Sequence, residues 1–130
     1  MKILLVTPAS PNGPTGNDVT ASRYARLLKQ LGASVTIDNA YANQPCDLMI
    51  ALHARRSFPS IRRYRDRNPN APLIVVLTGT DLYNDIKTSE EAQESLEAAT
   101  WLVVLQRLGL RELPARFHGK TSVIYQSAEW

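Results

Sequence analysis

Short apolar runs alternate with amphipathic stretches along the whole chain. Such runs, continuous or alternating and bounded by polar or turn-forming residues, cover 2–7, 33–38, 47–53, 73–77, 101–105 and 121–125. Runs rich in Leu, Ile and Val are typical of strands that are buried on both faces of a parallel sheet. We predict a β-strand at each of these six positions.

Between the apolar runs, hydrophobic residues recur at the spacing of helices. The clearest stripe follows the first strand and consists of Ala21, Tyr24, Ala25, Leu28 and Leu31. Asn17 is expected to cap this helix, and Gly32 is expected to end it. Further helices are predicted over 54–68 and from the capping-box spacing of Thr88 and Glu91 to about residue 99, with a helical turn over 108–113.

Strands that alternate with helices indicate parallel crossover units. The helix over 54–68 is expected to bury Phe58, Ile61 and Tyr64, and the helix that ends near 99 is expected to bury Ala92, Leu96 and Ala99. The sequence therefore predicts an α/β fold, a Rossmann-like three-layer sandwich around a mostly parallel six-stranded sheet.

Length and composition narrow the class of protein. The 130 residues suit one domain, and the formal net charge of +3 is compatible with an anionic ligand without requiring nucleic acid. Cys46 is the single cysteine, which excludes an internal disulfide and favours a reducing compartment. No apolar run is long enough for a signal peptide or a membrane span, so we expect a soluble cytoplasmic protein.

The loop over 8–17 is the first candidate site, because it is longer than most strand-to-helix connections and long loops are usually functional. Gly13 and Gly16 would let backbone amides approach an anionic ligand, and Asn17 and Thr20 follow at the start of the helix. The alternative is an ordinary surface loop rich in turn formers. The glycine spacing matches neither a dinucleotide fingerprint nor a P-loop.

Two further candidate sites follow the third and fourth strands. His53, Arg55 and Arg56 come directly after the third strand, where a histidine can hydrogen-bond a sugar or move a proton and arginines can bind a phosphate-like group in forked geometry. The fourth strand ends in Thr78, Gly79, Thr80 and Asp81, which offer a sharp turn, hydroxyls and a carboxylate. The alternatives are a satisfied polar histidine, a charged helix surface and a helix-capping turn.

The arginine run over 62–67 raises the question of nucleic acid, because Tyr64 lies within it. Helical spacing spreads these arginines around the helix, so a solvated outer face is the preferred interpretation and nucleic acid is not an expected partner. No residue set indicates a metal or a cofactor.

Several sequence strings together resemble a known enzyme family. They are Gly16-Asn17, Val19-Thr20-Ala21, Ala51-Leu52-His53-Ala54-Arg55-Arg56-Ser57, Leu77-Thr78-Gly79-Thr80-Asp81-Leu82-Tyr83 and Ile124-Tyr125-Gln126-Ser127-Ala128. The chain resembles the N-terminal half of a GT-B glycosyltransferase, and most closely the selenosugar synthases of selenoneine biosynthesis. Asp18 departs from this pattern, since relatives often carry a basic residue there.

The resemblance implies a function and partners. A sugar of the N-acetylglucosamine type would be transferred from its UDP carrier to selenophosphate, with a new carbon–selenium bond. Arg55 and Arg56 would bind the anionic acceptor, while His53 and Thr80 or Asp81 would orient the sugar. Residues 1–130 would then be the N-terminal acceptor-side domain, and the C-terminal nucleotide-sugar domain would be absent from this chain. The alternative is a stand-alone, flavodoxin-like anion-binding or regulatory module without catalysis.

Overall fold

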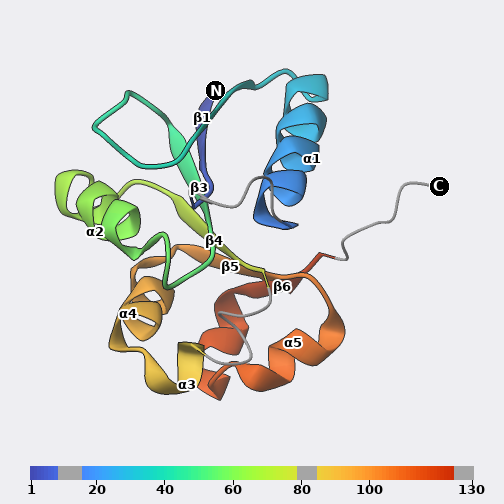
Figure 1. Cartoon of the computed structure of the whole chain (residues 1–130), viewed down its shortest axis with the longest axis vertical. Coiled ribbons are helices and arrows are strands. Elements are labelled where there is room, and N and C mark those ends of the chain that lie inside the picture. The colour runs from blue at the N-terminus through green and yellow to red at the C-terminus, as the bar shows by residue number, and fades with distance from the viewer. Residues whose placement is uncertain (9–15, 79–84, 125–130) are drawn as a thin grey trace.

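The computed structural model describes residues 1–8, 16–78 and 85–124, and it confirms the α/β class (Figure 1). Its six strands form one sheet in the order β2-β1-β3-β4-β5-β6, and every neighbouring pair is parallel. The strands are β1 (Lys2–Val6), β2 (Ser34–Asp38), β3 (Leu48–Leu52), β4 (Leu73–Leu77), β5 (Trp101–Val104) and β6 (Thr121–Val123). Each lies inside a run that the hydrophobic pattern predicts.

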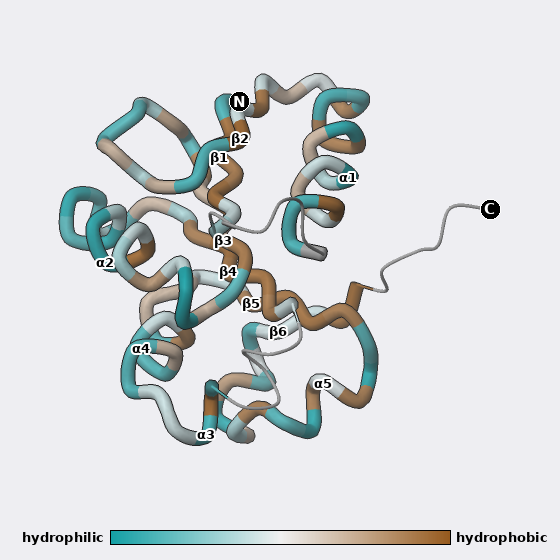
Figure 2. The backbone as a smooth tube through the Cα atoms, viewed as in Figure 1, coloured by the Kyte–Doolittle hydropathy of each residue, from teal (hydrophilic) through white to brown (hydrophobic). Residues whose placement is uncertain are grey.

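Helices cover both faces of this sheet (Figure 1). They are α1 (Gly16–Gln30), α2 (Phe58–Arg67), α3 (Ile86–Thr88), α4 (Glu90–Ala98), α5 (Arg107–Glu112) and the 3-10 helix η2 (Ala115–Lys120). Figure 2 shows the hydrophobic residues concentrated along the central strands, and hydrophilic residues along much of α2. None of the helices in the described ranges has the length and apolar character needed to span a membrane.

The two halves of the core follow from strand alternation, because successive side chains of a strand point to opposite faces. Ile3 and Leu5 of β1 pack in one cluster with Ala21 and Ala25 of α1. Leu4 and Val6 pack in the other cluster, which contains Ile61 of α2 and Leu96 of α4. The result is a Rossmann-like sandwich with the sheet as its middle layer.

Helix α1 differs from the prediction in the role of Asn17 and in the exposure of Leu31. It already includes Gly16, so Asn17 lies inside its first turn and does not cap it. Leu31 is 83 % exposed and not part of the core, because it follows the last helical residue. Gly32 has φ of +98° and ends the helix as predicted, since glycine tolerates this left-handed conformation.

The second and fourth helices also begin later than predicted. Helix α2 starts at Phe58, because residues 53–57 form a turn of their own, and Phe58 itself is only half-buried. The N-cap of α4 is Ser89 and not Thr88: the Ser89 side chain accepts a hydrogen bond from the backbone N–H of Ala92 at 3.2 Å. The predicted core residues of α4 are confirmed as buried.

Residues 39–47 join β2 to β3 without a helix, and we call this segment the strap. The two strands are parallel and lie on either side of β1, so the strap has to return from the carboxyl end of β2 to the amino end of β3. Tyr41 anchors it: the ring is buried in the core cluster of α2, and its backbone N–H donates to Ser60 Oγ at 3.0 Å.

Candidate functional site

The carboxyl ends of the parallel strands define one edge of the sheet, where α/β proteins usually bind ligands. Thr7 follows β1, His53 follows β3 and Thr78 follows β4, and these three strands are neighbours in the sheet. Helix α1 leads from the end of β1 back to the start of β2, so Gly16 begins it at this same edge. Gly16, His53 and Thr78, which are described members of three predicted groups, therefore lie along one rim.

The turn over 53–57 is held rigidly at this rim. His53 is 2 % exposed and has φ of +74°, a left-handed conformation that costs a non-glycine residue about 1–2 kcal/mol. Its backbone N–H donates to Val76 O at 2.9 Å, and its carbonyl accepts from the Ser57 N–H at 3.0 Å. Ser95 of α4 donates through Oγ to Ala54 O at 2.7 Å. The strained turn is thus fixed by both β4 and α4.

The surroundings of His53 assign its tautomer. The backbone N–H of Arg56 donates to His53 Nδ1 at 3.1 Å, so this nitrogen carries a lone pair and no proton. In the neutral ring the proton is then on Nε2, which lies 3.7 Å from Asp85 Oδ2. The imidazole therefore directs its N–H edge at a carboxylate.

Asp85 links this histidine to an arginine. Its Oδ2 atom lies 3.0 Å from Arg55 Nε, and the side chains of Asp85 and Arg55 are 18 % and 46 % exposed. This ion pair uses the Nε side of the guanidinium, while no hydrogen bond or ion pair within the described ranges engages its two Nη groups. Arg55 thus keeps the forked edge that binds oxyanions in two-point geometry.

Sequence reasoning missed Asp85. Its Oδ2 atom is buried, and across residues 1–8, 16–78 and 85–124 it receives no hydrogen bond of good geometry, so ion pairs alone balance its charge. The one local signal is its place directly before α3, as the N-cap residue of that short helix. The predicted acid of that loop, Asp81, lies outside the described residues.

The other predicted residues divide into those that the structure places and those that it does not describe. Thr20 is buried on α1, Asn17 is half-buried in the first turn, Thr78 is half-buried at the end of β4, and Arg56 is exposed beside His53. Gly13, Gly79, Thr80 and Asp81 lie outside the described residues. Thr7 adds a buried hydroxyl that has no hydrogen-bond partner in the described part of the chain, and strand alternation places it on the α1 side.

Comparison with known proteins adds no family: no family model matches the chain, and no curated protein matches it. Within the described ranges, no group of three or more His, Cys, Asp or Glu side chains is placed to hold a metal ion. The geometry of the rim is consequently the main basis for a functional conclusion.

Proposed function

We propose that this chain is the acceptor-side domain of a GT-B-type glycosyltransferase that transfers a sugar of the N-acetylglucosamine type from UDP to selenophosphate. The observation that carries the proposal is the arrangement of His53, Asp85 and Arg55 at the carboxyl edge of an all-parallel sheet. The sequence resemblance supplies the reaction, and the rim supplies groups whose chemistry suits an anionic acceptor.

In the proposed step, a lone pair on selenium attacks C1 of the sugar. The carbon–selenium bond forms as the bond between C1 and the diphosphate oxygen breaks, and UDP leaves with that electron pair. The oxyanion end of selenophosphate needs cationic partners throughout. Arg55 presents two Nη groups for it, and the exposed Arg56 adds a second positive charge beside it.

Asp85 and His53 serve as positioning residues in this proposal. Asp85 holds Arg55 through Nε, which orients the fork before the acceptor arrives. His53 in turn directs Nε2 towards Asp85, while its Nδ1 is occupied by the Arg56 backbone N–H. Both ring nitrogens of His53 thus face groups of the protein itself, which suits a positioning role. Most contacts to the UDP carrier are assigned in this proposal to a separate nucleotide-sugar domain.

The test is an anaerobic assay of the enzyme that joins this domain to its nucleotide-sugar domain, with UDP-N-acetylglucosamine and selenophosphate. UDP release and the mass of the selenium-bearing product are measured. Arg55→Ala should raise KM for selenophosphate about tenfold to a hundredfold, the loss of one strong charge-assisted pair, and Asp85→Asn should have a smaller effect of the same kind.

Lys29→Ala on α1 is the matched control, since it removes one positive charge from an exposed position in the last turn of that helix, at the opposite edge of the sheet. It should leave KM unchanged. Turnover of Arg55→Ala equal to that of the unmodified enzyme would refute the assignment of the site. Binding of selenophosphate without turnover of any UDP-sugar would instead favour the stand-alone binding module.

A further inference from the structure

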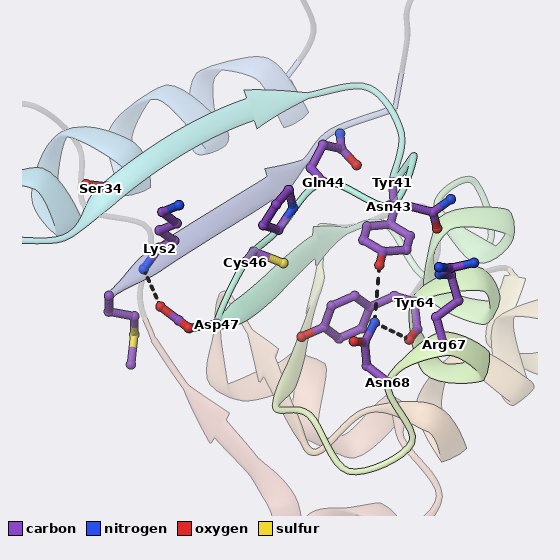
Figure 3. Close-up of a pocket in the computed structure, with 12 residues that line it drawn as sticks. Lys2, Ser34, Tyr41, Asn43, Gln44, Cys46, Asp47, Tyr64, Arg67 and Asn68 are labelled. Carbon is purple, nitrogen blue, oxygen red and sulfur yellow. Dashed lines mark hydrogen bonds between the residues drawn. The ribbon is translucent and has the colours of Figure 1, made fainter.

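The strap leaves space along the face that α2 covers. An extended segment is thinner than the helix that usually crosses between parallel strands, so it fills the layer incompletely. A cavity of about 730 Å³ opens between the strap and the end of α2, at the amino edge of β1 to β3 (Figure 3). A second cavity of about 400 Å³ continues along the outside of α2. Asn43 and Arg67 line both cavities, so the two form one groove.

The outer part of this groove carries excess positive charge. Arg62, Arg63 and Arg67 line it, and Asp66 is the one carboxylate among its lining residues. Asp66 lies 3.9 Å from Arg62, at the outer limit of an ion pair. Within the described residues, Arg63 and Arg67 have no acidic partner. Two guanidinium groups are thus left uncompensated beside a concave surface.

The groove is also formed in advance. Arg63 Nη1 donates to the carbonyl of Tyr41 at 3.1 Å, which holds this side chain against the strap. Asn43 has φ of +67°, a conformation that persists only where the surroundings hold it. Gln44 Nε2 holds the strap by donating to Asp38 and to Ala40 O, both at 3.1 Å. A ligand would therefore meet the strap and Arg63 without first having to order them.

We propose that this groove, on the α2 side and apart from the carboxyl-edge rim, binds a diphosphate group, either as free pyrophosphate or as part of a diphosphate ester. Arginines that converge on one concavity match a compact group with several charged oxygens. Single-stranded nucleic acid suits the groove less well, because it usually stacks its bases on aromatic rings. Tyr41 and Tyr64 line the inner cavity, but they are only 4 % and 1 % exposed and belong to the core cluster, so their rings offer little surface on which a base could stack.

The site can be tested by NMR titration of the ¹⁵N-labelled chain with inorganic pyrophosphate, at constant ionic strength. The backbone amides of Asn43, Arg63 and Arg67 should shift and saturate. The double variant Arg63→Ala/Arg67→Ala should bind at least about tenfold more weakly, because it removes two charge-assisted contacts. Arg107→Ala removes a positive charge from α5 and should bind within about twofold of the unmodified chain.

Arg67→Ala alone keeps the result interpretable if the double variant loses its fold, since no hydrogen bond in the described structure depends on the Arg67 side chain. It should bind about threefold to tenfold more weakly. A parallel titration with UDP distinguishes the two sources: equal affinity at the same amides assigns recognition to the diphosphate alone, and tighter binding assigns it to a nucleotide ester.

Three results would overturn the proposal. Shifts confined to the turn over 53–57 would place the anion at the carboxyl edge. If Arg107→Ala weakened pyrophosphate binding as much as the double variant does, the binding would depend only on the net charge of the chain and not on the groove. A single-stranded oligonucleotide that displaces pyrophosphate from the same amides, with a steep salt dependence, would identify nucleic acid as the occupant. None of these readouts depends on glycosyltransferase activity.

Discussion

Arg55 and Arg65 are the same residue type on either side of the start of α2, yet their surroundings differ completely. Arg65 lies among carbonyl groups: Nε and Nη2 donate to Ala98 O at 3.1 and 2.8 Å, and Nη1 donates to Ala71 O at 2.8 Å. Its Nη1 also reaches the carbonyls of Asn68 and Pro69. Arg55 has one carboxylate at its Nε, and its side chain is half-exposed.

The difference shows how to separate structural arginines from binding arginines. Arg65 satisfies carbonyls at the end of α4, where the last groups of a helix have no partner inside the helix. Lys120 also donates a hydrogen bond at this end of α4, from Nζ to Ala99 O at 2.6 Å. A guanidinium with all its edges in use has nothing left for a ligand. Arg55 has an ion pair on its Nε side and leaves its other donors available, and a binding residue requires such available donors.

The largest effect should come from Arg65→Ala. The variant leaves several carbonyls without donors, and we expect it to lower the free energy of unfolding by about 3 kcal/mol. Arg55→Ala should change that free energy by less than about 1 kcal/mol, because a half-exposed ion pair contributes little. Urea denaturation followed by circular dichroism measures both. Equal destabilisation by the two variants would contradict the distinction drawn between them.

Much of the fold was predictable because it depends on local patterns. Buried strands in a parallel sheet leave continuous apolar runs, and the order of strands and helices then fixes the class. Tyr64 and Ile61 are confirmed as core residues because helical spacing alone places them on the inner face. Arg65, one residue further, was expected on a solvated face and instead contacts the end of α4.

The features of the fold and the site that could not be predicted depend on contacts between segments that are distant in the sequence. The position of His53 at the end of a strand followed from the sequence, but its ion pair with Asp85 joins residues far apart in the chain. Nothing local in the sequence of the strap showed that it would cross from β2 to β3 and leave a groove. The left-handed φ of His53 was likewise hidden, since histidine gives no sequence signal for it.

The left-handed φ of His53 allows a test of whether the turn over 53–57 is rigid. His53→Gly and His53→Ala both lose the hydrogen bond from the Arg56 N–H to Nδ1, so they differ mainly in how the backbone tolerates +74°. Glycine adopts this conformation freely, and we expect His53→Gly to be more stable than His53→Ala by about 1 kcal/mol. Thermal unfolding of the pair gives the difference. An alanine variant as stable as the glycine variant would show that the turn relaxes.

The smallest effect concerns Tyr64, which shares α2 with Arg65. Its hydroxyl donates to Pro72 O at 3.1 Å, and Tyr64→Phe should lower stability at neutral pH by about 0.5–1 kcal/mol. Burial raises the pKa of Tyr64 from 10.0 to about 12, and the positive charge of Arg65 opposes this rise. The folded state therefore holds the phenol proton more tightly than the unfolded chain does.

Because its pKa is higher in the folded state, the protonated Tyr64 phenol contributes its full stabilisation of the fold below pH 10. This stabilisation is lost as the pH rises from 10 towards 12. The unmodified chain should accordingly lose stability more steeply over that range than Tyr64→Phe, which has no phenol to ionise. Unfolding free energies measured in urea at several alkaline pH values give both slopes. Parallel curves would mean that the phenol is solvated in the folded state, and that the inner face of α2 is less well shielded than Arg65 and its carbonyls imply.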